Sequence, residues 1–129
     1  MSQLTPSQIG RKGERYARRF LRKKGWRCVG KNLRFGNDEL DILALTPDAK
    51  TLVIVEVRST MDRRRIPEQT IGSKKRAAML RVAKQLRGEA KKYNCTLQMD
   101  LITVRLYEKK PIIEHFQGIL KLSMMREFA

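Results

Sequence analysis

Two segments of the chain carry apolar residues at the three- and four-residue spacing of an amphipathic helix. The first follows Ser7, a predicted N-cap, and stops at Gly25; the second follows a predicted N-cap at Ser73. The apolar positions are Ile9, Gly13, Tyr16, Ala17, Phe20 and Leu21 in the first segment, and Ala78, Met79, Val82, Ala83, Leu86 and Ala90 in the second. We therefore expect two helices, each with one buried stripe.

Further segments have the alternation or the short apolar runs of β-strands. A short strand and an exposed turn are expected within 26–36, and longer strands at 38–45, 51–58 and 96–107. The segment "PIIEHFQ" (111–117) is expected to pair with the last of these strands. The order helix, three strands, helix, two strands predicts an α/β fold, a mixed β-sheet flanked by α-helices. A length of 129 residues fits a single domain, with a core at about 8–107 and a C-terminal extension at 108–129.

The hairpin expected at 38–58 has acidic residues inside its strands, where acidic residues are depleted. A two-residue turn and a four-residue turn (47–50) give the same register, in which Asp41 faces Glu56 and Glu39 faces Arg58. Strand geometry then places the Cβ atoms of Asp41 and Glu56 about 5 Å apart on one face. Leu40 and Ile42 are expected on the other face. Both faces are otherwise apolar, so the sheet is expected to be covered on both sides.

Two ionised carboxylates at this separation repel by about 3 kcal/mol at an effective dielectric constant of 20. A magnesium ion offsets such repulsion, since it is commonly held by one or two carboxylates, waters and substrate phosphates. The alternative is that Asp41 and Glu56 form salt bridges with Arg58 or with another of the surplus cations.

Glu14 is the only acidic residue within 1–36. On a helical wheel it falls at the border between the apolar stripe and solvent. An ion pair with Arg18, one turn later, is the simplest interpretation of that position.

The charge of the chain is strongly positive and unevenly distributed. The sequence has 29 Lys and Arg against 13 Asp and Glu, a net charge of +16, and its basic residues concentrate in 1–36 and 57–92. This pattern predicts a polyanionic partner, with nucleic acid as the first candidate and no membrane as a partner. Aromatic residues are few, so binding is expected to depend on phosphates and to be steeply salt-dependent.

Other features give no further chemistry. Cys28 and Cys95 lack metal-site spacing and are expected to be ordinary small residues in a reducing compartment, the cytoplasm. His115, the sole histidine, lies beside Glu114 and Phe116 in an expected edge strand and is assigned a surface or structural role. No apolar run reaches the length of a membrane span.

Four motifs in order resemble the YraN-type family of predicted endonucleases in the PD-(D/E)XK nuclease superfamily, which is similar to archaeal Holliday-junction resolvases. They are Gly10 to Ala17 ("GRKGERYA"), "ELDILA" (39–44), "VIVEVR" (53–58) and "PEQTIGSKK" (67–75). The resemblance covers about 8–105. It implies a restriction-endonuclease-like core and a magnesium-dependent endonuclease, in which manganese can substitute for magnesium. It also implies that the protein can form a homodimer.

The resemblance also assigns roles. Asp41 matches the metal-binding aspartate, Glu56 the acidic residue of E-x-K, and Glu14 a further carboxylate contributed by the first helix. The expected catalytic residues are Asp41, Glu56, Arg58 and Glu14, the expected metal ligands are Asp41, Glu56 and Glu14, and the expected nucleic-acid contacts are Arg11, Lys12, Arg15, Arg34, Lys74 and Lys75.

Arg58 is a departure, because it stands where the motif usually has lysine. Arginine stays protonated and binds phosphate as a planar fork, so it cannot act as a general base. Lys74 or Lys75 is the nearest replacement by motif. The leading hypothesis is therefore an endonuclease of DNA, including branched or structured DNA. The alternative is a nucleic-acid-binding protein that keeps the nuclease fold with weakened or lost catalysis.

Overall fold

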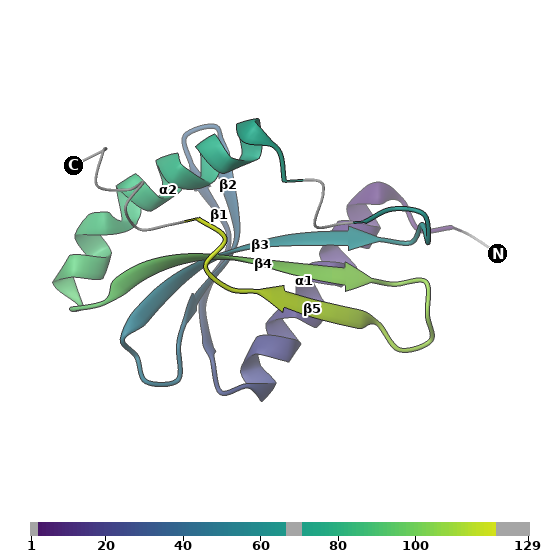
Figure 1. Cartoon of the computed structure of the whole chain (residues 1–129), viewed down its shortest axis with the longest axis horizontal. Coiled ribbons are helices and arrows are strands. Elements are labelled where there is room, and N and C mark those ends of the chain that lie inside the picture. The colour runs from purple at the N-terminus through teal and green to yellow at the C-terminus, as the bar shows by residue number, and fades with distance from the viewer. Residues whose placement is uncertain (1–2, 67–70, 121–129) are drawn as a thin grey trace.

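The computed structural model describes residues 3–66 and 71–120 (Figure 1). In chain order its elements are α1 (Pro6–Lys23), β1 (Arg27–Phe35), β2 (Asp38–Leu45), β3 (Thr51–Thr60), α2 (Ser73–Lys92), β4 (Thr96–Arg105) and β5 (Ile112–Phe116). The predicted order of helices and strands is confirmed. Within these described ranges, no helix is both long and apolar enough to cross a membrane.

The strands form one sheet in the order β1-β2-β3-β4-β5. Strands β3 and β4 are parallel and are connected through α2, whereas the other neighbouring strands are antiparallel. The fold is therefore the expected mixed sheet flanked by helices, with β3 at its centre (Figure 1).

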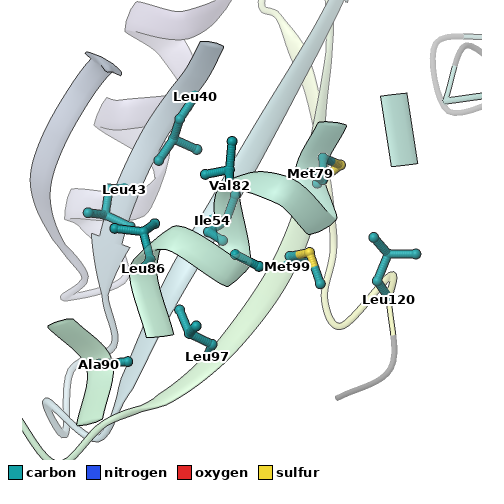
Figure 2. Packing of buried hydrophobic residues seen from close by; sticks show 11 residues of the cluster. Leu40, Leu43, Ile54, Met79, Val82, Leu86, Ala90, Leu97, Met99 and Leu120 are labelled. Atoms are coloured by element: carbon teal, nitrogen blue, oxygen red, sulfur yellow. The ribbon is translucent and has the colours of Figure 1, made fainter. Parts of the chain in front are cut away.

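Helix α2 covers one face of the sheet, and α1 covers the other. Under α2, Met79 and Val82 pack in one buried cluster with Ile54 and Met99 (Figure 2). Under α1, Ala17 and Leu21 share a second cluster with Ile42, Val53 and Val55. Burial on both faces explains why the hairpin strands are apolar on both sides.

The start of each helix differs from the prediction. The N-cap of α1 is Thr5, whose hydroxyl accepts from Gln8 N at 3.1 Å while Gln8 Oε1 accepts from Thr5 N at 2.8 Å. Pro6 then occupies the first turn, where its missing N–H has no cost, so the helix begins before Ser7. In α2, Gly72 is the N-cap and Ser73 is the first helical residue.

The register predicted for the β2–β3 hairpin is confirmed. Leu43 faces Ile54 and Leu45 faces Leu52. The turn is the four-residue alternative, 47–50, because Thr46 N donates to Thr51 O at 3.1 Å.

The same two strands part at their other end. Pairing between β2 and β3 runs only as far as Ile42 and Val55, although both strands lie in the described part of the chain. Strand β2 remains paired with β1 back to its first residue, Asp38, and β3 remains paired with β4 to its last residue, Thr60. The sheet is therefore split between β2 and β3, beside the expected position of Asp41 and Glu56.

Leu40 was predicted on the same face as Ile42, and this is wrong. Its side chain packs under α2 against the cluster that contains Leu43 and Val82 (Figure 2). The change of face coincides with the point at which β2 leaves β3, where the ladder no longer holds the alternation of side chains.

Candidate active site

A pocket of about 630 Å³ lies at the split of the sheet. It is bounded by the first turns of α1, the separated ends of β2 and β3, the turn after β3, and Lys75 in the first turn of α2. Five carboxyl side chains line it, which are Glu14, Glu39, Asp41, Glu56 and Asp62, and its cations are Arg58, Arg65 and Lys75. A chain of net charge +16 thus gathers five of its 13 acidic residues in one hollow.

Asp41 connects the separated strands. Its Oδ2 atom accepts a hydrogen bond from Val57 N at 2.9 Å. The carboxylate takes the place of a partner that the ladder no longer supplies to this backbone N–H, which is buried. The strand geometry therefore fixes one oxygen of Asp41 and leaves its other oxygen to the pocket.

Glu14 and Glu56 both come within hydrogen-bonding reach of Asp41. Burial, followed by the negative charge of Asp41, raises the pKa of Glu14 from 4.5 to about 7. The same two causes, in the same order, raise the pKa of Glu56 from 4.5 to about 8, although Lys75 acts in the opposite direction. Lys75 does not offset this crowding, because the pKa of Glu56 stays raised with the charge of Lys75 present.

Two cations approach Glu56, whose side chain is only 5% exposed. Lys75 Nζ lies 2.9 Å from Glu56 Oε2, and Arg58 Nη2 lies 3.9 Å from Glu56 Oε1. The predicted facing of Glu39 and Arg58 is wrong, because the strands have already parted at these positions. Glu39 instead pairs in register with Arg34 on β1.

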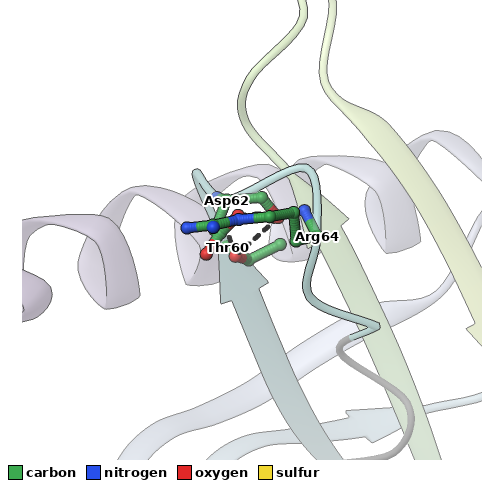
Figure 3. A network of polar contacts seen from close by, with 3 residues as sticks. All are labelled: Thr60, Asp62 and Arg64. Carbon is green, nitrogen blue, oxygen red and sulfur yellow. Dashed lines mark hydrogen bonds and ion pairs between the residues drawn. The ribbon is translucent and has the colours of Figure 1, made fainter.

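The turn after β3 forms another wall of the pocket and is held by its own polar contacts (Figure 3). Thr60 Oγ1 accepts from Asp62 N at 3.0 Å, and Asp62 Oδ1 accepts from Arg64 N at 2.9 Å and from Arg64 Nε at 3.3 Å. The Arg64 backbone and side chain accordingly hold the pKa of Asp62 below its usual value. This turn also directs Arg65 to the pocket.

The basic residues that were expected to contact nucleic acid lie in several different places in the structure. Lys75 is in the pocket, whereas Lys74 is exposed outside it. Arg11 and Arg15 are exposed on α1, and Lys12 is half-buried. Arg34 is exposed on β1.

The carboxylates suit a hard divalent cation by their chemistry. Such an ion prefers oxygen ligands. Its positive charge also offsets the mutual repulsion that contributes to the raised pKa values. In the described residues no group of three or more His, Cys, Asp or Glu side chains is arranged to hold a metal ion. Magnesium commonly uses only one or two carboxylates, so Asp41 with Glu56 or Glu14 meets its needs.

His115 lies outside this pocket. Its Nε2 atom is 2.7 Å from Asp100 Oδ2, and both side chains are almost fully buried. Lys24 Nζ lies 2.9 Å from the other ring nitrogen, while Phe20 and Trp26 meet the ring edge-to-face. These contacts tie β5 and the end of α1 to the centre of the sheet, which is a structural arrangement.

Some pocket residues had no signal that sequence reasoning used. Thr60 ends β3, Asp62 and Arg65 belong to the turn that follows it, and only the run of three arginines, 63–65, marked that segment. Ser59 also lines the pocket, and α1 approaches it closely at Gly13: a Cβ atom on Gly13 would lie 2.7 Å from Ser59 Cβ. Cys28 and Cys95 are free thiols, as expected.

Comparisons with known proteins identify relatives across most of the chain. A UPF0102 protein of Carboxydothermus hydrogenoformans is 30% identical over 114 residues, covering 88% of this chain and 95% of that protein. A UPF0102 protein of Alkaliphilus oremlandii is 34% identical over 114 residues, covering 86% and 96%.

One solved structure, that of Pyrococcus furiosus SfsA in complex with Ca²⁺, is similar with a TM-score of 0.30 and 13% identity. It covers 87% of this chain and 62% of that one, a likeness too weak to bear on fold or function. The family model described as "Uncharacterised protein family UPF0102" matches residues 13–104. The chain therefore belongs to the uncharacterised protein family UPF0102, the YraN-type family.

Proposed function

We propose that the chain is a magnesium-dependent endonuclease that hydrolyses DNA phosphodiester bonds. One observation carries the proposal: Glu14, Asp41 and Glu56 converge at a split in the sheet of a strongly basic protein, with Lys75 beside them. The motif order resembles that of the PD-(D/E)XK superfamily, and the mixed sheet flanked by helices is consistent with a restriction-endonuclease-like core.

Asp41 and Glu56 are the proposed metal ligands, with Glu14 as the alternative second carboxylate. A bound magnesium ion, for which manganese can substitute, supplies Lewis-acid polarisation of the phosphodiester and lowers the pKa of a bound water. Asp41 is already oriented for this task by its bond to Val57 N. Glu56 becomes available when Lys75 turns from it towards the substrate.

The pocket cations have different roles in the proposal. Lys75 positions the attacking water or a non-bridging phosphate oxygen with its ammonium group. Arg58, whose side chain is 33% exposed, stabilises the charge that develops on the phosphate through its planar guanidinium group. Arg65, on the turn after β3, supplies a further contact to the DNA backbone. The DNA partner is recognised by phosphates and shape, which suits branched or structured DNA as a substrate.

A non-catalytic DNA-binding role is the competing function, and Glu56 is the observation that favours it. Lys75 Nζ already lies 2.9 Å from its carboxyl group, and the strand position two residues later holds Arg58 in place of lysine. Those contacts reduce the demand for a metal ion. In that case the chain would bind the phosphates of DNA without cleaving them, and the pocket would have lost its catalytic role.

A cleavage assay separates the two functions. Single-stranded, duplex and four-way-junction DNA are incubated with magnesium or manganese and with wild type, Asp41→Asn, Arg58→Lys or Glu89→Gln. Glu89 is an exposed acid on α2 and lies outside the pocket, so its variant is the matched control for charge and purification. We expect metal-dependent cleavage by wild type and Glu89→Gln, and its loss in Asp41→Asn.

Two outcomes contradict the proposal. If Asp41→Asn cleaves as fast as wild type, the assigned site is wrong. If wild type is inert and Arg58→Lys gains activity, the chain is a degenerate nuclease and the competing function holds.

A further inference from the structure

Four arginines form a ridge along the outer side of α1. The spacings between them are four, three and four residues, which puts all four within about 60° of one another on a helical wheel. The members of this α1 ridge are Arg11, Arg15, Arg18 and Arg22. Arg18 is half-buried and the other three are exposed. On the helical wheel the ridge is centred about 110° from the midpoint between Ala17 and Leu21, which are buried against the sheet.

The α1 ridge is not neutralised by neighbouring acids. Among the described residues, none of its guanidinium groups lies within 4.0 Å of a carboxylate, although the charge of Arg18 acts on Glu14. Helix α2, which also carries many cations, differs in this respect. There Lys75 pairs with Glu56 and Arg81 pairs with Asp38. Surplus positive charge that could attract a polyanion is therefore greater along α1.

The ridge also begins at the pocket. The pocket is lined by residues of the first turns of α1, including Ile9, Gly10 and Glu14. Arg11, the first member of the ridge, directly follows Gly10 in the sequence. From Arg11 to Arg22 the helix rises about 16 Å. That length matches about five phosphates of one DNA strand, spaced about 3.4 Å apart along the axis.

We propose that the DNA backbone leaving the carboxylate pocket lies along α1, with its phosphates on the α1 ridge. This inference rests on the proposed function and adds the partner surface, its direction from the pocket, and two residues, Arg18 and Arg22, that motif matching did not assign. Because the contacts are to phosphates, the ridge contributes affinity without base preference. Helix α2, on the opposite face of the sheet, contributes only its first turn.

The test compares two triple variants with the same change of charge. Arg11→Gln/Arg15→Gln/Arg22→Gln removes three ridge charges, and Arg87→Gln/Lys91→Gln/Lys92→Gln removes three from the last two turns of α2, away from its first turn. Glutamine keeps a helix propensity close to that of arginine and lysine, so both helices are retained, and circular dichroism checks this. Affinity for a labelled duplex of about 20 base pairs is measured by fluorescence anisotropy in EDTA, from about 50 to about 200 mM salt.

Each lost phosphate contact lowers the slope of log affinity against log salt by about 0.9, so the ridge variant should lose about 2 to 3 from that slope. The α2 variant should lose less than about 1. Equal losses in the two variants, or an unchanged slope in the ridge variant, would overturn the inference.

The outcome is separable from that of the proposed function, because binding in EDTA does not depend on catalysis. Wild-type cleavage that Asp41→Asn abolishes, together with an unchanged ridge slope, overturns the inference and leaves the endonuclease in place. A wild type that neither binds nor cleaves DNA overturns both.

Discussion

Lys75 Nζ lies 2.9 Å from Glu56 Oε2 and joins the first turn of α2 to the central strand of the sheet. The lysine side chain is 26% exposed, and the carboxylate is 5% exposed. The strand position two residues after Glu56, in contrast, is occupied by Arg58. A lysine ammonium group is therefore present in the pocket although the strand does not provide it.

If Lys75 positions the water or the phosphate, replacing it should slow cleavage more than it weakens binding. We expect Lys75→Met to reduce kcat for DNA cleavage by about 100-fold, the lower range for a positioned proton-transfer group, with little change in KM. Lys75→Arg should likewise keep KM near its wild-type value without restoring kcat. Steady-state cleavage of a labelled duplex measures both quantities.

Lys74→Met is the matched control, since Lys74 is exposed outside the pocket. We expect it to change kcat by less than about threefold, as a surface charge should. Equal losses in the two variants would show that net charge at this end of α2, rather than the Lys75 contact, sets the rate.

The raised pKa values of Glu14 and Glu56 predict that stability without metal depends on pH. A carboxyl group whose pKa is raised by folding holds its proton more tightly in the folded state, so the free energy of unfolding falls as the pH rises. The fall should begin near the ordinary value of 4.5 and be complete above about 8, the pKa of Glu56. Asp41→Asn should flatten this dependence, because it removes a negative charge that raises both pKa values.

Urea unfolding in EDTA between about pH 5 and about pH 9 measures the effect. Asp48→Asn, in the exposed hairpin turn, is the control, since the hydrogen bond from Thr46 and the Lys50 backbone lower the pKa of Asp48. Added magnesium should raise the unfolding free energy of wild type at the alkaline end and have little effect on Asp41→Asn. A stability that rises with pH over this range would contradict the proposed crowding of carboxylates.

Much of the fold could be predicted because several local signals agree. The apolar stripes predicted both helices, and the even-length turn set the register that brings Leu43 opposite Ile54. Extrapolating that register placed Asp41 next to Glu56 even though the ladder ends one residue earlier. The acidic residues were informative because a charge inside an apolar strand is costly unless something compensates for it.

The features that escaped prediction depend on contacts between distant elements. Periodicity gives no sign that β2 pairs with β3 only from Ile42 onwards, so the predicted face of Leu40 was wrong. The choice between Lys74 and Lys75 depends on how α2 is rotated over the sheet, which follows from packing of the whole helix. The Thr5 cap was missed because Ser7 is also a good N-cap residue, and only the Pro6 position decides between them.

Helix α1 approaches β3 closely at Gly13, so a side chain at that position should not fit. We therefore expect alanine to lower the free energy of unfolding at Gly13 and to raise it at Gly88. Gly13→Ala should lower the free energy of unfolding by about 1 to 3 kcal/mol, because the new methyl group overlaps Ser59. Gly88→Ala, where the added methyl group meets nothing within 4 Å, should raise it by about 0.5 to 1 kcal/mol. Chemical denaturation of both variants measures the difference. Stabilisation by Gly13→Ala would show that α1 does not pack this closely on the strand.

The buried pair of Asp100 and His115 should be essential for stability and irrelevant to cleavage. Asp100 accepts from His115 Nε2 at 2.7 Å, Gln98 Nε2 at 2.8 Å and Gly118 N at 3.0 Å, so Asp100→Ala leaves three donors without their acceptor. We expect a loss of about 3 to 5 kcal/mol in the free energy of unfolding, as for breaking a buried pair.

Glu114→Gln is the control, because it removes an exposed charge on β5, the strand that carries His115. It should lower the free energy of unfolding by less than about 1 kcal/mol. Cleavage per folded molecule, measured below the unfolding temperature, should be unchanged in both variants, because neither side chain lines the pocket. Loss of cleavage by folded Asp100→Ala would instead connect this cluster to the carboxylate site through the central strands β3 and β4, where Val55 is paired with Asp100.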